Sequence, residues 1–280
     1  MASPLFSVVT VALDAGEALR RSAESVAAQT WTDLEHLVKD GGSSDGSVQE
    51  VAALPRVRVV SAPDSGIYDA MNQALRACTG RLVLFLNAGD VFSSLDALAQ
   101  VAEHVIRDEA DLYYCDLLRA DLPVPVRHPE QLTRFFLFRT QICHQACFYR
   151  LDVYRRLGDF DTTYRFTADA EFLLRAVLRE KLRARRVPVA ATVYEGGGFS
   201  ARPENWPRVV EENRRARERH FSRAERMVFG ALLALTLRPL RFAMLRSDGL
   251  RALRPAYQRA VNGWNAAGRR RARGTCGPTP

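Results

Sequence analysis

The sequence predicts an α/β fold, with a mixed, mainly parallel sheet that has helices on both faces. One observation is a series of short, nearly continuous apolar runs, typical of strands buried on both sides, at residues 5–13, 34–39, 57–60 and 81–86. The other is that segments with an apolar stripe at helical spacing alternate with these runs, at residues 18–29, 67–77 and 94–107. Alternating strands and helices favour a parallel sheet.

The first two expected strands end at small polar loops. The first stops at Asp14, and the second stops at the loop DGGSSDGS, which begins with Asp40 and Gly41. On its own this loop indicates a flexible turn, although its small residues would let a flat ligand approach the backbone. Ser44 or Asp45 is suited to cap the helix that follows.

Residues 61–90 contain the most informative pattern. Asp64–Gly66 predicts a tight turn, and a helix at 67–77 and a buried strand at 81–86 follow it. The strand stops at the loop NAGD, in which Asp90 is the one acid. A carboxylate at the end of a buried strand can hold a hard divalent cation, and that cation can bind phosphate oxygens.

Three expected strands therefore end in an acid, at Asp14, Asp40 and Asp90. The carboxyl ends of parallel strands meet at one edge of a sheet, which is where open α/β sheets bind ligands. We therefore expect the three carboxylates to point into one crevice.

The pattern resembles the family 2 inverting glycosyltransferases of the GT-A fold, particularly the bacterial branch that builds colanic-acid-type and phenolic-glycolipid-type cell-surface glycans. In that branch the pattern is D-x-G-x-Y-D-A-M-N, then Thr-Gly, then F-L-N-x-x-D. This chain matches it at Asp64, Gly66, Tyr68, Asp69, Ala70, Met71, Asn72, Thr79, Gly80, Phe85, Leu86, Asn87 and Asp90. The resemblance covers about residues 5–200.

The resemblance implies a hexosyltransferase that moves a sugar from a UDP- or GDP-sugar donor to a lipid-linked or polysaccharide acceptor. It implies a divalent metal, Mn²⁺ or Mg²⁺, at Asp90. The family often carries a second acid just before this one, but here Ala88 and Gly89 stand there, so ligation would depend on Asp90 with donor phosphates and water. It also implies a nucleotide and donor site at Asp14, Asp40, Gly41, Asp64, Tyr68, Asp69, Asn72, Asn87, His144, Gln145 and Gly197.

The segment QICHQACFYR, residues 141–150, resembles the family's I-C-H-Q-A-x-F-Y-R, near the sugar and acceptor side of the site. His144 and Gln145 are then candidates for holding donor phosphates or sugar hydroxyls, and a hydrogen-bonded core histidine is the alternative. A zinc site at Cys143, His144 and Cys147 is not expected, because no second cluster of ligands is present.

Beyond residue 110 we expect strands at 111–118 and 187–194, an edge strand or loop at 122–127 and a short helix at 131–138. A further helix begins near Thr167. Inverting transfer needs a carboxylate to take the proton of the incoming hydroxyl.

The family places its base in an E-D-x-D or A-D-x-D/E motif at the head of such a helix. The resemblance therefore implies Asp169 as the catalytic base, with Glu171 as the alternate. Helix capping by Thr167 and Asp169 is the structural alternative. The loop EGGGFS, with Gly197, resembles a family segment that closes over the donor phosphates.

The net charge of +8 is unevenly distributed. Residues 201–280 hold 18 arginines against 6 acids, whereas residues 1–200 carry a net charge of −4. A charged helix is expected at 208–226, and the apolar run at 227–237 is too short to span a bilayer. Such a basic extension can lie on an anionic membrane or pack on the domain as an amphipathic helix.

We therefore expect a catalytic domain at 1–200, a basic amphipathic helical extension that associates with the membrane at 201–268, and a disordered tail at 269–280. The five cysteines show no paired spacing and the opening residues show no signal-peptide pattern. Both favour a cytoplasmic protein, peripheral on the inner face of the cytoplasmic membrane.

Two other functions are alternatives to glycosyl transfer. A nucleotidyltransferase acting on sugar phosphates also uses strand-end carboxylates, but the first strand is not followed by the glycine-rich loop with Arg or Lys that such enzymes carry. A non-catalytic basic nucleic-acid-binding protein would use the arginine-rich tail. That tail lacks interleaved aromatic side chains and the acidic domain would repel phosphate, so no nucleic-acid partner is expected.

Overall fold

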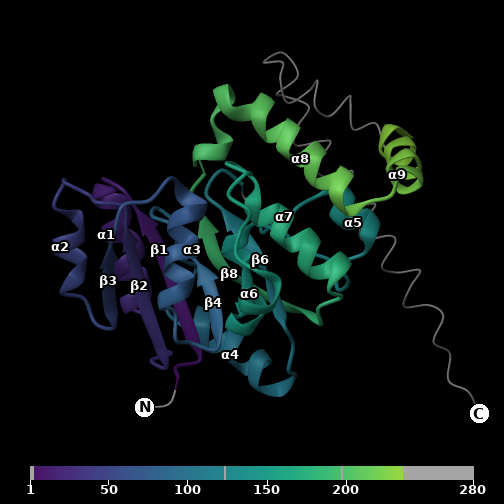
Figure 1. The fold of residues 1–280 in the computed structure, drawn as a ribbon. Coiled ribbons are helices and arrows are strands. Elements are labelled where there is room, and N and C mark those ends of the chain that lie inside the picture. The colour runs from purple at the N-terminus through teal and green to yellow at the C-terminus, as the bar shows by residue number, and fades with distance from the viewer. Residues whose placement is uncertain (1–2, 123, 197, 236–280) are drawn as a thin grey trace, which may run out of the picture. The chain divides into compact units, whose positions relative to one another are not determined.

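The computed structural model describes residues 3–122, 124–196 and 198–235. The chain forms two compact units, residues 1–222 and residues 223–280. The first unit contains an eight-stranded sheet in the order β3-β2-β1-β4-β7-β6-β8-β5 (Figure 1). The predicted α/β class, with a mixed and mainly parallel sheet, is confirmed.

The N-terminal half of the sheet is entirely parallel. Its strands are β1 (Phe6–Ala12), β2 (Leu34–Asp40), β3 (Val57–Ser61) and β4 (Leu82–Phe85). β1 pairs with both β2 and β4, and β2 pairs with β3. All four strands therefore end at one edge of the sheet, as the alternation of strands and helices predicted.

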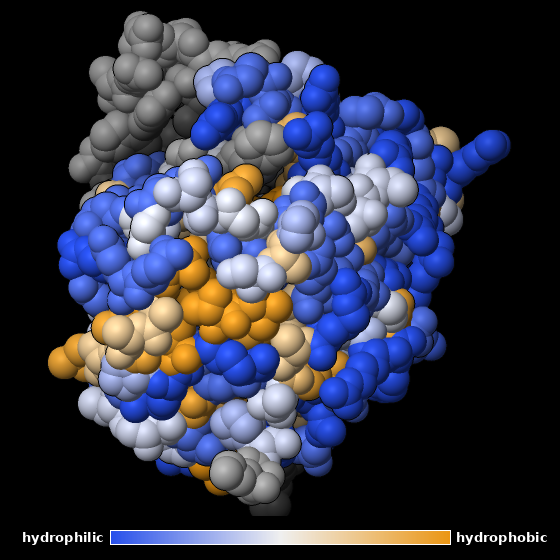
Figure 2. Space-filling view, turned by 60° about the vertical axis from the view of Figure 1, so that its left-hand side comes forward, coloured by the Kyte–Doolittle hydropathy of each residue, from blue (hydrophilic) through white to orange (hydrophobic). Residues whose placement is uncertain are grey.

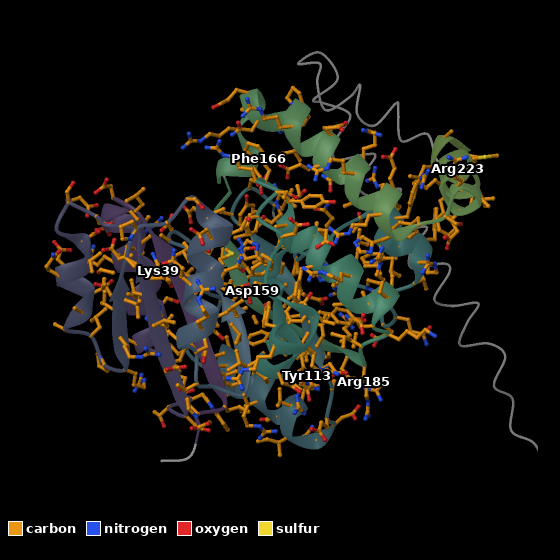
Figure 3. The ribbon with its side chains drawn as sticks, in the orientation of Figure 1. Lys39, Tyr113, Asp159, Phe166, Arg185 and Arg223 are labelled. Carbon is orange, nitrogen blue, oxygen red and sulfur yellow. The ribbon has the colours of Figure 1, made fainter. Side chains whose placement is uncertain are left out.

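The second half is mixed. β7 (Cys147–Arg150) is antiparallel to both β4 and β6 (Leu112–Arg119). β8 (Ala184–Tyr194) is parallel to β6, and the two-residue strand β5 (Val91–Phe92) closes the edge against β8. Figure 3 labels Lys39 on β2 and Tyr113 on β6, one in each half of the sheet. The face of the molecule in Figure 2 is mostly hydrophilic around a central apolar area.

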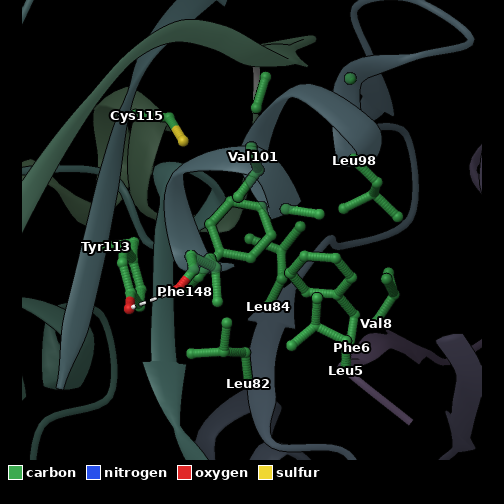
Figure 4. Packing of buried hydrophobic residues seen from close by; sticks show 14 of the residues in the cluster. Leu5, Phe6, Val8, Leu82, Leu84, Leu98, Val101, Tyr113, Cys115 and Phe148 are labelled. Carbon is green, nitrogen blue, oxygen red and sulfur yellow. Dashed lines mark hydrogen bonds between the residues drawn. The ribbon is translucent and has the colours of Figure 1, made fainter. Parts of the chain in front are cut away.

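Helices cover both faces of the sheet. The first layer contains α1 (Gly16–Ala27), α2 (Ser47–Ala52) and α4 (Ala97–Arg107). In the core under this layer, Phe6 and Leu84 pack with Leu98 and Val101 of α4 (Figure 4). Burial of these side chains stabilises the fold by about 1.5–3 kcal/mol each.

The opposite layer contains α3 (Ile67–Ala77), α6 (Leu151–Leu157) and α7 (Ala168–Leu174). Because side chains alternate along a strand, Phe85 faces this second layer. There its ring lies 5.5 Å from that of Phe160, and the stacked rings of Tyr154 and Phe172 are 4.7 Å apart. This aromatic cluster fixes α7 against the sheet.

The remaining elements of the first unit are α5 (Arg134–Arg139), the 3₁₀ turns η1 (His144–Ala146), η3 (Phe199–Ala201) and η4 (Pro203–Asn205), the π-helical turn η2 (Arg175–Arg179) and α8 (Trp206–His220). The second unit begins with α9 (Arg223–Leu235). Among the described residues, no helix is both long and apolar enough to cross a bilayer.

Some expectations differ from the structure. The predicted helix at 208–226 is divided, because Phe221 takes an extended conformation and packs its ring 5.3 Å from that of Phe138. The segment at 122–127 forms one isolated bridge, between Val126 and Leu117. β5, β7 and α6 were not predicted. The expectations for residues 238–268 and for the tail at 269–280 lie outside the described residues.

Candidate active site

The loops after β1 and β2 are joined to each other at the edge where these strands end. One carboxylate oxygen of Asp14 accepts a hydrogen bond of 2.8 Å from the Ser44 amide, and the Asp14 amide donates to the Ser43 hydroxyl at 2.9 Å. Asp40 accepts from the Ser43 amide at 2.8 Å. Burial favours the neutral form of Asp40, but the hydrogen bonds from Ser43 outweigh it and lower its pKa. Asp40 is therefore anionic beside Asp14.

A fully buried lysine, which the sequence analysis did not select, connects β2 to the loop after β3. The Lys39 ammonium donates to the carbonyl oxygens of Asp40 (2.8 Å) and Ala62 (2.6 Å) and to the Asp64 carboxylate (3.1 Å). These three bonds use all the donors of an ammonium group. A Cβ on Gly41 would lie 2.9 Å from Asp64 Oδ2, so a larger residue there would displace the Asp64 carboxylate.

Two of the α3 residues expected to bind the donor have structural partners. The Asp69 carboxylate accepts from the Ser65 amide at 2.8 Å and so holds the turn before its own helix. The Asn72 side chain exchanges two hydrogen bonds of 2.9 Å with the backbone of Phe160, joining α3 to the segment before α7.

Asp90 lies just after β4 and is only 5% exposed. Gln145 donates to one of its oxygens at 2.8 Å, and the Glu195 amide donates to the other at 3.1 Å. Burial raises the pKa of Asp90, although the hydrogen bond from Gln145 opposes this shift. The Glu195 contact places the start of the glycine loop beside Asp90, while Gly197 itself is outside the described residues.

The residues around Asp90 fit a divalent metal whose coordination is completed by substrate atoms. Among the residues that the structure describes, no group of three or more His, Cys, Asp or Glu side chains could hold a metal. Mg²⁺ in nucleotide enzymes is commonly held by one or two carboxylates together with substrate phosphates. Each Asp90 oxygen accepts one hydrogen bond, so each retains a free lone pair for such a cation. A nearby cation would also offset the cost of keeping this buried carboxylate ionised.

Asp169 opens α7 and accepts hydrogen bonds from two different elements. The Tyr68 hydroxyl of α3 lies 2.8 Å from Oδ1, and His144 Nδ1 of η1 lies 3.1 Å from Oδ2. Burial favours the protonated acid, but the contacts from His144 and Tyr68 outweigh it and keep the pKa of Asp169 below its usual value. The side chain stays 20% exposed, so this carboxylate is both ionised and accessible.

Glu171, the alternate base, is fully buried and faces α8. Its carboxylate lies 2.8 Å from His220 Nε2 and 3.2 Å from the Arg175 guanidinium. Burial alone would raise the pKa of Glu171, but His220 and Arg175 lower it. A buried, ion-paired carboxylate is a poor acceptor for a substrate proton, so the geometry favours Asp169 for that task.

The turn η1 connects the two acids, although Asp90 and Asp169 are far apart in the sequence. His144 contacts Asp169 while the next residue, Gln145, contacts Asp90. The Gln145 carbonyl is held in turn by the Thr192 hydroxyl at 2.9 Å. His144 and Gln145, which are adjacent in the sequence, therefore hold the carboxylates of Asp169 and Asp90 at the same edge of the sheet.

The loop before Asp169 is held by a glutamate that sequence reasoning missed. Glu212 of α8 accepts hydrogen bonds from the amides of Arg165 (2.8 Å), Phe166 (2.9 Å) and Thr167 (3.0 Å) and from the Thr167 hydroxyl (3.1 Å). Thr167 therefore does not cap α7 with its side chain. Nothing local in the sequence distinguishes this glutamate from a solvated charge on α8.

The mixed, mainly parallel sheet with helices on both faces matches the GT-A fold. Residues 7–164 match the sequence profile of Glycosyl transferase family 2. The chain belongs to this family and is a glycosyltransferase.

One relative and two solved structures illustrate what this chain is similar to. A PGL/p-HBAD biosynthesis glycosyltransferase of Mycobacterium bovis is 34% identical over 208 residues, which cover 71% of this chain and 80% of the relative. The fold is similar to S. aureus TarS 1-349 in complex with UDP, with a TM-score of 0.62 at 17% identity over 92% of this chain and 78% of that one. It is also similar to the mannosyltransferase PcManGT of Pyrobaculum calidifontis in complex with GDP-Man and Mn²⁺, with a TM-score of 0.56 at 17% identity over 90% and 83% of the two chains.

Proposed function

We propose that this protein is an inverting, metal-dependent glycosyltransferase that moves a sugar from a UDP- or GDP-sugar to a lipid-linked or polysaccharide acceptor in bacterial cell-surface glycan synthesis. The observation that carries the proposal is the turn η1, which holds Asp90 through Gln145 and Asp169 through His144. Inverting transfer needs such a pair of sites, one for the leaving diphosphate and one for the attacking hydroxyl.

In the proposed reaction, the acceptor hydroxyl gives its proton to the Asp169 carboxylate. The acceptor oxygen forms a bond to the anomeric carbon from the side opposite the leaving group. The bond between that carbon and the diphosphate oxygen breaks, and its electron pair leaves with the nucleoside diphosphate. Mn²⁺ or Mg²⁺ held by Asp90 would supply positive charge for that diphosphate. The ionised state of Asp169 supports its role as the base.

The nucleotide is proposed to lie at the ends of β1 and β2, with Asp14, Asp40, Gly41 and Asp64 around it. The complexes of similar folds with UDP, UDP-GlcNAc and GDP-Man support a nucleotide-sugar donor. The relative named for PGL/p-HBAD biosynthesis supports a glycolipid-type acceptor. Because Asp69 and Asn72 already bond to the protein, their proposed contribution is to shape the donor site.

We also propose that the basic part of the extension that follows α8 attaches this enzyme to the inner face of the cytoplasmic membrane. Its arginine excess supports attraction to anionic lipid. On α9, Met227 and Val228 are 74% and 56% exposed, as expected of side chains that enter a membrane interface. Binding to phosphatidylglycerol vesicles that disappears at high salt, with no binding to phosphatidylcholine vesicles, would test this part.

A donor screen tests the main proposal. Thermal shift would be measured with UDP-, GDP- and dTDP-sugars, each with Mn²⁺, with Mg²⁺ and with a chelator. One donor class is expected to raise the melting temperature, and only when metal is present. Release of the nucleoside diphosphate should then rise when a lipid-linked acceptor is added. If no nucleotide sugar stabilises the protein under any metal condition, the proposed function is wrong.

A further inference from the structure

A chain of hydrogen bonds runs from the end of β4 to the proposed base. The Asn87 amide nitrogen lies 2.9 Å from His144 Nε2, and His144 Nδ1 lies 3.1 Å from Asp169 Oδ2. Resting on the proposed function, we propose that His144 is a positioning residue whose Nδ1–H fixes the Asp169 carboxylate, and that Asn87 holds the His144 ring in the required tautomer.

The tautomer follows from the chemistry of the three groups. A neutral imidazole has one N–H donor and one acceptor nitrogen. The amide nitrogen of Asn87 can only donate, so Nε2 of His144 must accept, and the ring proton is then on Nδ1, opposite a carboxylate that can only accept. The other amide atom, Asn87 Oδ1, is buried with no hydrogen-bond partner. With the amide rotated, its oxygen would accept from Nε2–H, and a neutral ring would then have no proton on Nδ1 for Asp169, so the proposal requires the orientation with the amide nitrogen at Nε2.

Both ring nitrogens of His144 are therefore used within the protein. Nε2 is engaged by Asn87 and Nδ1 by Asp169, which leaves no ring nitrogen for a phosphate or a sugar hydroxyl. The imidazole is also mostly buried, with 17% of its side chain exposed. This arrangement separates His144 from Gln145, whose contact is with Asp90.

The carboxylate of Asp169 is held on both oxygens. Tyr68 donates to Oδ1 from α3 while His144 donates to Oδ2 from η1, so rotation of the side chain would break at least one bond. The other ionisable groups that act on Asp169 are Cys143 before η1, Cys147 and Tyr149 of β7, and Tyr154 of α6. Burial raises the pKa of all four groups, so they carry no charge near pH 7. The side-chain donors to this carboxylate are His144 and Tyr68, and a hydrogen bond from the Ala170 amide also lowers its pKa.

The test compares two isosteric substitutions. In His144→Asn the amide nitrogen can occupy the place of Nδ1 and keep the bond to Asp169. In His144→Gln the longer amide reaches the place of Nε2, so the contact with Asn87 is kept and the donor to Asp169 is lost. His144→Ala removes both contacts. His104→Asn, on α4, is the matched control and should behave as wild type.

The readouts are kcat and KM for transfer from the donor found by the screen, the affinity for its nucleoside diphosphate with metal, and the pH profile of kcat/KM. His144→Ala and His144→Gln are expected to lose about 10- to 100-fold in kcat, a part of what a general base contributes. The acidic limb of their pH profile should move to higher pH, because the bond from His144 that lowers the pKa of Asp169 is gone. His144→Asn should recover most of the loss, and nucleotide affinity should stay within about twofold in all variants.

A second comparison tests the part assigned to Asn87. Asn87→Leu should lower kcat in the wild-type background. Without the Asn87 donor, the proton of the His144 ring is free to move to Nε2, and Nδ1 then has no proton to donate to Asp169. The same substitution should add little in His144→Asn, where no tautomer exists. Equal losses in both backgrounds would overturn the role of Asn87.

The possible outcomes distinguish a failure of this inference from a failure of the proposed function on which it rests. If the His144 variants weaken nucleotide binding tenfold and leave kcat unchanged, His144 is a donor ligand and the inference is wrong. It is equally wrong if His144→Gln is as active as His144→Asn. If Asp169→Asn retains turnover, the failure lies with the proposed base and not with its positioning.

Discussion

Glu212 provides the sharpest test of how the base is held in place. Glu212 is 7% exposed, and its carboxylate accepts one hydrogen bond on Oε1 and three on Oε2, all from residues 165–167, shortly before Asp169. In Glu212→Gln the amide oxygen can keep at most the three bonds of one side, each weakened by the loss of charge. The amide nitrogen then faces a backbone N–H with no acceptor between them.

The magnitude follows from these contacts. A hydrogen bond to a charged group contributes about 1.5–3 kcal/mol, and a buried donor left without an acceptor costs about 1–3 kcal/mol. We therefore expect Glu212→Gln to lower the free energy of unfolding by about 3 kcal/mol, and Glu212→Ala by about 4 kcal/mol. For a unit of this size, 3 kcal/mol corresponds to a decrease of roughly 6–12 °C in Tm.

The adjacent residue gives a matched control. Glu211 lies on the same helix but is about half exposed and pairs with Arg214 on the surface, so Glu211→Gln should cost less than about 0.5 kcal/mol. Urea unfolding followed by circular dichroism would measure both variants, and turnover would be measured on the folded fraction. Turnover should fall in Glu212→Gln as well, because the Phe166 carbonyl of the same loop accepts from Tyr68, which also holds Asp169. If the two glutamine variants differ by less than about 1 kcal/mol, the argument is refuted.

Three further predictions concern single groups. Asp169→Asn should abolish transfer, by about 10²–10⁴-fold, with nucleotide affinity near normal, as measured by diphosphate release and titration calorimetry. Asp90→Ala should remove the metal dependence of nucleotide binding, and a variant with the wild-type dependence on Mn²⁺ would exclude this ligand. Burial lowers the pKa of His36 from 6.5 to about 4, so the unfolded chain binds a proton in that window while the folded chain does not. Stability should then fall by about 1.4 kcal/mol per unit as pH drops from 6.5 toward 4, and a flat series of urea midpoints would contradict this.

The parts of the fold set by local patterns could be predicted from the sequence. The apolar runs that became β1, β2 and β4 need only burial on two faces, and the acids that follow them come to one edge because the strands are parallel. β7 was missed for the opposite reason. Its four residues carry no periodicity of their own, and they form a strand because β4 and β6 lie on either side.

The hydrogen-bond partners of the side chains at the site could not be predicted from local sequence patterns. Lys39 lies near the end of a buried strand, and its ammonium is tolerated there because three acceptors surround it, one from the end of β2 and two from the loop after β3. Tyr68 and Asp169 are each recognisable as motif residues, but their hydrogen bond joins positions 101 residues apart. Such pairings depend on tertiary packing, which a motif does not encode.

The helix α8 bears on where the catalytic domain ends. It lies beyond the family match, which ends at residue 164, and its arginine-rich sequence suggested an extension separate from the catalytic domain. Yet its inward face presents Glu212 to the loop before Asp169 and His220 to Glu171, and both contacts are buried. A helix whose buried acid satisfies three successive amides cannot leave without exposing unpaired donors next to the base. We therefore infer that the functional domain extends to residue 222, where the first compact unit ends, and that membrane attachment would begin only after it.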